Sequence, residues 1–136
     1  MGYKNSYLIS SLKKSLLELN VEDVSVECER ELREEKVILD HFLPPILQVG
    51  YDREYYEDPT GIRITVDQNI QFYGSLPHQK LNTTLPTPYS LNVMEIKFEP
   101  HLKNEMANLI KPLNVSPQRN SKYLFGMAML GYTTYI

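Results

Sequence analysis

Charged side chains recur at alternate positions in two segments, 61–70 (GIRITVDQNI) and 94–99 (MEIKFE). A third segment, 51–56 (YDREYY), places one arginine among tyrosines. Arginine can hold phosphate oxygens with two parallel hydrogen bonds, and a lone carboxylate among cations is a natural ligand for Mg²⁺ or Mn²⁺. These residue types therefore suit phosphate chemistry with a divalent metal. The candidates in the three segments are Arg53, Arg63, Glu95 and Lys97.

The same alternation also fits an antiparallel sheet with one face in solvent and one face on a core. In that interpretation Arg53 forms a structural ion pair with Asp67 or Glu95. Within segment 61–70, Arg63 and Asp67 occupy alternate positions and therefore lie on one face of the strand, which we call the charged face, and the isoleucines lie on the other face. We predict that the charged face of this strand is directed away from the core. Asp67 and Asn69 are interpreted as structural partners.

The elements that position these residues can be predicted from apolar spacing. Leucines at helical spacing predict a helix over 6–19 that stops at Asn20, followed by an amphipathic helix at roughly 23–42. A β-hairpin is expected from strands 46–56 and 62–72, followed by an irregular stretch 74–90. A strand is expected over 91–99, with Met94, Ile96 and Phe98 on its apolar face. Two helices are expected after it: one over 102–113, with Leu102, Met106, Leu109 and Ile110 facing inward, and a closing one over 122–130.

Length and composition limit the classes of protein. The chain has 136 residues, enough for a single domain, with a helical segment 1–45 before the segment 46–136. The net charge of −3 argues against broad binding of nucleic acid or of an anionic membrane. The lone Cys28 excludes an internal disulfide and a multi-cysteine metal site. No apolar stretch reaches membrane-spanning length and no secretory signal is recognisable, so we expect a cytoplasmic protein.

Four short motifs occur in the order and spacing of the VTC domain: YDREYY (51–56), GIRITVDQNI (61–70), MEIKFE (94–99) and NSKYLFGMAML (120–130). The chain resembles this family, the polyphosphate polymerase domain of vacuolar transporter chaperones and their bacterial relatives. The family belongs to the CYTH-like triphosphate tunnel superfamily. The resemblance implies an α+β fold whose antiparallel sheet forms part of a triphosphate-tunnel-like barrel, with N-terminal and C-terminal helices.

The resemblance also implies roles for individual residues. Arg53 and Arg63 occupy positions of phosphate-binding arginines, and Lys97 and Lys122 those of phosphate-binding lysines. Glu95 corresponds to the metal-binding glutamate, with Mn²⁺ or Mg²⁺ as the expected cofactor. The catalytic residues are not identified. Alternatively, Lys97 lies in solvent at the tunnel rim and Lys122 only flanks a helix.

The motifs cover only the C-terminal half of the family pattern, about residues 46–130. The early Arg-x-Arg and Glu-x-Lys strands of the family are not found in residues 1–45. We therefore expect either a fragment or a half-domain completed by a second copy or by a separate N-terminal partner.

The resemblance implies a partial polyphosphate polymerase domain that binds polyphosphate or a nucleoside triphosphate for phosphoryl transfer. The alternative is a non-catalytic module that binds phosphate or polyphosphate, or that serves assembly. Binding of nucleic acid is not expected, because the chain is acidic and lacks a platform of aromatic and basic residues.

Overall fold

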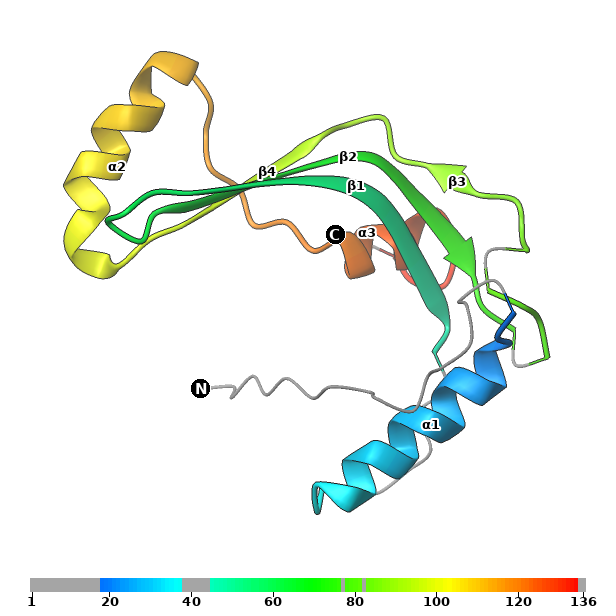
Figure 1. Ribbon diagram of the computed structural model, residues 1–136. Coiled ribbons are helices and arrows are strands. Elements are labelled where there is room, and N and C mark those ends of the chain that lie inside the picture. Colours follow the sequence, from blue (N-terminus) through cyan, green and yellow to red (C-terminus); the bar gives the residue numbers. More distant parts are fainter. Residues whose placement is uncertain (1–17, 38–44, 77, 82, 135–136) are drawn as a thin grey trace. The chain divides into compact units, whose positions relative to one another are not determined.

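The computed structural model describes residues 18–37, 45–76, 78–81 and 83–134 (Figure 1). These residues contain helices and an antiparallel sheet, which confirms the α+β class. They divide into two compact units. The first comprises Met1–Gln48 and Tyr73–Pro86, and the second comprises Val49–Phe72 and Thr87–Ile136. No helix among the described residues is long and apolar enough to cross a membrane.

The first unit contains helix α1, Val21–Glu34, whose start is fixed by a capping box. The side chain of Asn20 accepts a hydrogen bond from the backbone N–H of Asp23 at 2.7 Å, and Asp23 accepts one from the backbone of Asn20 at 3.4 Å. Such reciprocal bonds satisfy two N–H groups that a helix start leaves free. Asn20 therefore begins α1. It was predicted to stop a helix over 6–19, most of which lies outside the described residues.

The second helix was predicted to extend further toward the C-terminus than it does. The helix ends at Glu34, and Lys36 has a positive φ of 60°, which is incompatible with continued right-handed helix. The prediction had extended to residue 42, of which 38–42 lie outside the described residues, as does most of the predicted helix 6–19. The chain before α1 pairs with segment 79–81, since Val21 donates to the carbonyl of Gln79 at 2.9 Å.

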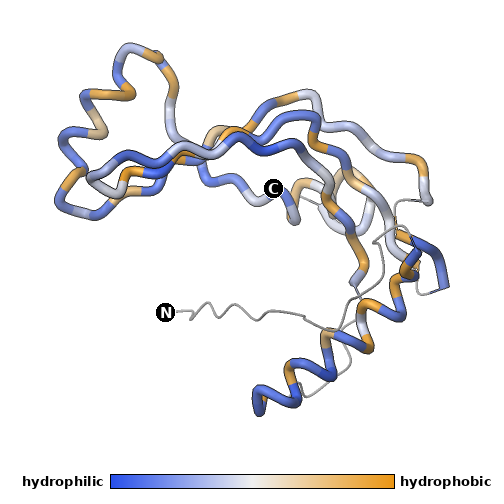
Figure 2. Tube along the Cα trace, in the orientation of Figure 1, coloured by the Kyte–Doolittle hydropathy of each residue, from blue (hydrophilic) through white to orange (hydrophobic). Residues whose placement is uncertain are grey.

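The sheet is built around a hairpin of two long strands, β1 (Leu47–Glu57) and β2 (Arg63–Gly74), as predicted. Asp58 organises its turn by accepting hydrogen bonds from the backbone N–H groups of Thr60 and Ile62 at 2.9 and 3.0 Å. Gly61 supplies the positive φ of 86° that this turn requires. β1 is hydrophilic along its middle and more apolar near its start (Figure 2).

Two further strands pair with different parts of β2. The predicted strand appears as β4 (Val93–Lys97), whose ladder sets Arg63 opposite Lys97 and Thr65 opposite Glu95. The two-residue strand β3 (Thr87–Pro88) pairs with the end of β2 inside the stretch predicted to be irregular. The resulting order is β1-β2-β3, with β4 also on β2.

An interruption in β2 changes which side chains share a face. Asn69 has a positive φ of 50°. Gln68 and Asn69 both donate to the carboxylates on the far side of β1 from Arg53, at Glu54 (3.3 Å) and Asp52 (2.8 Å). Two consecutive side chains on one face, with one residue in the left-handed region, define a β-bulge.

The bulge turns the last apolar residues of β2 onto the face that carries Asp67. Ile70 and Phe72 are 1% and 0% exposed. The ring of Tyr89 lies 6.0 Å from that of Phe72 and 5.5 Å from that of Phe125, which belongs to helix α3 (Lys122–Met129). Helix α3 therefore packs on this face, on the concave side of the sheet (Figure 1). It matches the predicted closing helix.

The predicted helix 102–113 consists of α2 (Lys103–Ile110) between two short 3₁₀ turns, Pro100–Leu102 and Lys111–Leu113. Met106 is 2% exposed, as expected of an inward residue. Leu109, also predicted to face inward, is 58% exposed. That prediction was wrong because the less exposed residues are four apart, at Leu102, Met106 and Ile110, and Leu109 lies to one side of this stripe.

The sheet is open in the described part of the chain. β1 and β4 each lack a strand partner on the side away from β2, so the described strands do not close into a barrel. On β4, Ile96 is half-buried but Met94 is 46% exposed, and Phe98, just after the strand, is 39% exposed. All three were predicted to face a core. The tunnel implied by the family resemblance therefore stays a prediction.

Candidate functional site

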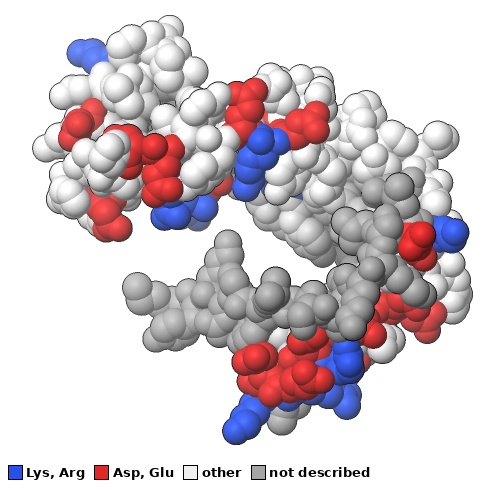
Figure 3. Space-filling view, viewed as in Figure 1, with Lys and Arg blue, Asp and Glu red and all other residues white. Residues whose placement is uncertain are grey.

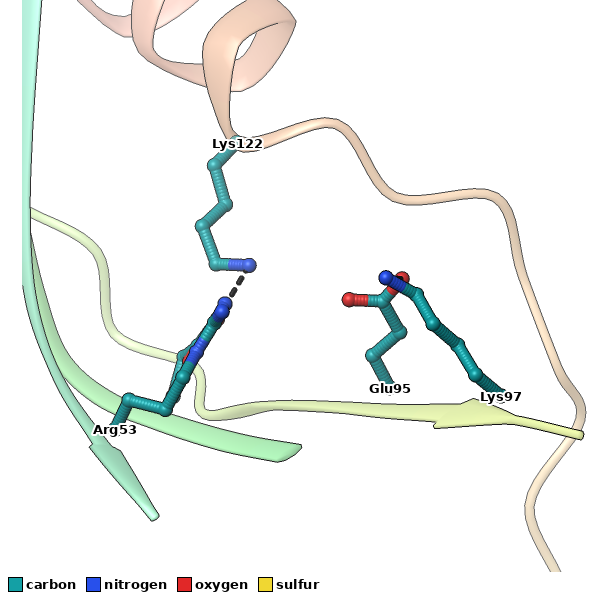
Figure 4. A network of polar contacts seen from close by, with 5 residues as sticks. Arg53, Glu95, Lys97 and Lys122 are labelled. Carbon is teal, nitrogen blue, oxygen red and sulfur yellow. Dashed lines mark hydrogen bonds and ion pairs between the residues drawn. The ribbon is translucent and has the colours of Figure 1, made fainter. Parts of the chain in front are cut away.

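One buried carboxylate gathers two of the predicted phosphate-binding residues. Arg53 on β1 contacts Asp67 on β2 in a side-on pair, with Nε 2.6 Å from Oδ1 and Nη2 2.8 Å from Oδ2. Lys122, the first residue of α3, places Nζ 2.5 Å from the same Oδ2. Arg53 and Lys122 thus point toward one another from two elements that are distant in sequence (Figure 4).

A tyrosine ring lies against both cations. The Tyr51 ring centroid is 4.9 Å from Cζ of Arg53 and 5.4 Å from Nζ of Lys122. A cation at this distance is attracted by the negative face of the ring. Tyr51 precedes Arg53 by two residues on β1, so the alternation of a strand places both side chains on one face. We call Tyr51, Arg53, Asp67 and Lys122 the Asp67 cluster.

The electrostatics of the Asp67 cluster follow from its burial. The Asp67 side chain is only 1% exposed. The hydrogen bonds from Arg53 lower the pKa of this carboxyl to about 2, and Lys122 adds to the effect, although desolvation opposes it. The same hydrogen bonds raise the pKa of Arg53, and more distant Glu95 contributes slightly. Asp67 is thus an anion at every physiological pH, with two cations against it.

The neighbouring strand contributes a second group on the same face. Directly opposed residues of an antiparallel ladder point to the same side of the sheet, so Lys97 shares a face with Arg63, and Glu95 with Thr65. Glu95 and Lys97 lie side by side on β4, with Oε1 3.3 Å from Nζ (Figure 4). Both side chains are about half exposed, so this pair contributes little to stability.

Oxygen atoms near Glu95 are of the type that Mg²⁺ or Mn²⁺ prefers. Thr65 Oγ1 is buried and has no hydrogen-bond partner among the described residues, and its ladder partner is Glu95. In the same part of the chain no three His, Cys, Asp or Glu side chains gather as metal ligands. The residues present fit a metal that takes one protein carboxylate and completes its shell with water and phosphate oxygens, as Mg²⁺ commonly does.

All five predicted site residues lie in the second unit, four of them on one face of its sheet and Lys122 at the start of helix α3, which packs on that face. Arg53 and Lys122 meet at Asp67, and Glu95 and Lys97 form a pair. Arg63 lies opposite Lys97, and among the described residues no hydrogen bond or ion pair joins it to the Asp67 cluster. Their roles in binding phosphate and metal stay predictions. The ion pair of Arg53 with Asp67 was one of the two structural alternatives left open by the sequence.

Two residues of the cluster were not among the predicted site residues: Tyr51 was given no role, and Asp67 was interpreted only as a structural partner. Tyr51 could have been found from its shared parity with Arg53. Asp67 was expected on a face away from the core, yet it is fully buried. That prediction was wrong because α3 covers this part of the face, and nothing in segment 61–70 indicates the covering helix.

The surface around the site is of mixed charge rather than uniformly basic. Lysine and arginine side chains lie next to aspartate and glutamate side chains over the sheet (Figure 3). On β1 the Tyr55 hydroxyl donates to Glu57, and this bond raises the pKa of Tyr55, while nearby Arg63 lowers it. Any affinity for anions must therefore come from locally placed cations, because the net charge of the chain is −3.

Comparison with known protein families identifies the class of this chain. It matches the family model of the VTC domain over residues 8–131, so the chain belongs to the VTC domain family. The match starts well before residue 46 and therefore includes N-terminal residues that the motifs had left outside the resemblance. Comparisons with curated proteins and with solved structures gave no significant match.

The lowered pKa of Asp67 predicts a specific acid dependence of stability. A carboxyl with an ordinary pKa of about 3.9 in the unfolded chain and about 2 in the folded chain stabilises the fold above pH 4 by about 3 kcal/mol. That contribution is lost as the pH falls toward 2. Urea unfolding at pH 2 to 6 should show wild type losing more stability than Asp67→Asn over this range.

The matched control for this experiment is Asp52→Asn, which removes an exposed carboxylate from the other face of the same hairpin. It should follow the wild-type pH dependence closely. If Asp67→Asn and wild type lose stability in parallel between pH 4 and pH 2, the pKa of Asp67 is not lowered in the folded chain. The ion pairs of Asp67 with Arg53 and Lys122 then contribute nothing to the free energy of unfolding.

Proposed function

We propose that this chain is a VTC-type domain that binds triphosphate or polyphosphate for phosphoryl transfer, as a partial polyphosphate polymerase. One observation carries the proposal: four cations share one face of the sheet in a member of the VTC family, and two of them are fixed on a buried carboxylate. These residues are Arg53, Arg63, Lys97 and Lys122.

The spacing of the cations favours a chain of phosphates over a single anion. Asp67 follows Arg63 by four residues on β2, which corresponds to about 13 Å of strand. The cations therefore form two groups, one at the Asp67 cluster and one where Arg63 faces Lys97. One sulfate ion is too small to reach both groups, whereas a linear polyanion can contact both at once.

Phosphoryl transfer needs positioning and charge stabilisation more than proton transfer. The arginines and lysines of the site supply N–H donors that align phosphates and neutralise their charge. The described residues near the site include no histidine or cysteine in contact with the Asp67 cluster. A phosphate acceptor is already an anion and requires no general base to attack, so this composition suits the proposed reaction.

Glu95 is the residue proposed to hold Mn²⁺ or Mg²⁺, with the hydroxyl of Thr65 beside it on the sheet. A divalent ion bound there supplies positive charge that stabilises the transferring phosphoryl group. The exposed carboxylate of Glu95 has Lys97 as its partner, so the ammonium group must yield part of that contact when a metal binds.

The second candidate function is a non-catalytic module that binds phosphate or polyphosphate. The mixed charge of the face favours it, because carboxylates offset much of the positive charge (Figure 3). Incubation of the pure chain with ATP and Mn²⁺, followed by gel analysis of any polyphosphate formed, separates the two functions. Binding without synthesis supports the module, and synthesis that Arg63→Ala abolishes supports the polymerase.

The binding proposal predicts that tripolyphosphate binds more tightly than equimolar sulfate in calorimetry. Arg63→Ala should weaken tripolyphosphate binding by about tenfold, since charge-assisted hydrogen bonds contribute about 1.5–3 kcal/mol. Arg30→Ala, which removes an exposed arginine of α1 paired with Glu27, is the control and should bind normally. Equal weak heats for both anions, unchanged by Arg63→Ala, would leave only the interpretation in which the charged face of the sheet is exposed to solvent without binding phosphate.

The metal proposal predicts that Mn²⁺ strengthens tripolyphosphate binding by wild type and that Glu95→Gln loses most of this gain. The substitution is nearly isosteric and removes only the charge. Glu54→Gln is the control, because Glu54 is an exposed carboxylate on the opposite face of β1. If Mn²⁺ has no effect on wild type, or if Glu95→Gln keeps the full gain, Glu95 is a partner of Lys97 and not a metal ligand.

We also propose that a second copy, or a separate N-terminal partner, borders the free sheet edges. Unpaired strand edges expose backbone groups, and a homodimer satisfies them while bringing two sets of cations together. Because those cations repel one another, a bound polyanion should favour the dimer. Sedimentation at micromolar concentration should show a dimer that tripolyphosphate tightens. A monodisperse monomer in both conditions contradicts the homodimer and favours the separate partner.

A further inference from the structure

Asp67 differs from the other carboxylates of the site because it is buried beneath the cations. Its side chain is 1% exposed, whereas those of Arg53 and Lys122 are 38% and 19% exposed. Nε and Nη2 of Arg53 bond to Asp67, and Nη1 has no hydrogen-bond partner among the described residues. An anion arriving from solvent therefore meets the cations first and cannot reach Asp67 without displacing them.

The two cations need this carboxylate in order to stay together. Both lie against the Tyr51 ring and both contact Oδ2 of Asp67, so their charges are close enough to repel strongly. Asp67 offsets that repulsion and leaves one net positive charge for the three groups. Each long side chain also loses rotamer freedom when it is fixed, and here that loss occurs on folding instead of on ligand binding.

The structure assigns Asp67 as a positioning residue of the proposed phosphate site: it fixes Arg53 of β1 and Lys122 of α3 as a preformed pair whose remaining N–H groups bind phosphate oxygens. This inference rests on the proposed function. It adds that a negatively charged residue increases the affinity of the site for a polyanion.

The sign of this effect separates positioning from simple electrostatics. If Asp67 acted only through its charge, it would repel phosphate, and its neutralisation would tighten binding. If Asp67 positions the pair, Asp67→Asn weakens binding although the chain gains positive charge. Asparagine keeps one oxygen acceptor but cannot hold the side-on guanidinium and the ammonium together.

The test is calorimetry of tripolyphosphate with wild type, Asp67→Asn and the control Asp52→Asn at one fixed salt concentration. We expect Asp67→Asn to bind about tenfold more weakly, and Asp52→Asn to bind as wild type or slightly more tightly. Asp52 undergoes the same chemical change on the opposite face of the hairpin, and an asparagine there keeps an oxygen that can accept the hydrogen bond from Asn69, so this control reports chiefly the effect of charge. Equal or tighter binding by Asp67→Asn overturns the inference.

A purely structural role for Asp67, in holding α3 on the sheet, is tested by a double-mutant cycle with Lys122→Gln. Positioning predicts that Asp67→Asn loses less affinity in the Lys122→Gln background than in wild type, because one of the two cations it positions is already gone. Additive losses overturn the inference. The Nε–H NMR signals of the five arginines give a direct readout: that of Arg53 should lose exchange protection in Asp67→Asn but not in Asp52→Asn.

Asp67→Glu keeps the buried charge and replaces Asp67→Asn in these measurements if the asparagine variant does not fold by circular dichroism. Its longer side chain displaces the carboxylate, so we expect weaker tripolyphosphate binding with no change in net charge. If neither variant folds, Asp67 is a residue of the fold and the inference is wrong. If wild type binds no tripolyphosphate, the proposed function fails; if wild type and Asp67→Asn bind equally, only the role of Asp67 fails.

Discussion

The pairing of the buried Asp67 carboxylate with two cations is the interaction on which the second unit depends. An unpaired carboxylate inside a protein is strongly unfavourable, so this residue tolerates burial only with Arg53 and Lys122 in place. The partners come from β1 and from α3, while Asp67 itself lies on β2. One carboxylate thereby connects the hairpin to a helix more than 50 residues later in the chain, and it does so at the proposed site.

The bulge at Asn69 determines how the face that carries Asp67 is used. Before the bulge, the concave face of β2 carries polar side chains such as Arg63 and Asp67; after it, the same face carries Ile70 and Phe72. The apolar part receives α3 through the aromatic contacts of Tyr89. The start of α3 then lies beside the polar part, so its first residue can reach Asp67. A regular strand would have sent Phe72 to the opposite face from Asp67.

Strand alternation was enough to predict that Arg63, Glu95 and Lys97 share one face, because the regular ladder between β2 and β4 preserves the period of two. It was not enough to predict the burial of Asp67 or the change of face after Asn69. The sequence alone does not indicate that Asn69 adopts a left-handed conformation, because that conformation depends on how β2 pairs with β1. The short strand β3 was missed for a related reason: two residues, one of them Pro88, carry no period.

The aromatic and acidic members of the site were harder to predict than its cations because their functions depend on tertiary contacts. Arginine and lysine have few roles on a sheet face besides solvation, ion pairing and binding of anions, so their types alone suggested phosphate. Tyr51 and Asp67 become informative only when Lys122 is placed against both. For the same reason, the net charge of −3 is a poor guide to this chain. A buried anion that holds two cations lowers the net charge, yet it fixes the N–H groups that are proposed to bind a polyanion.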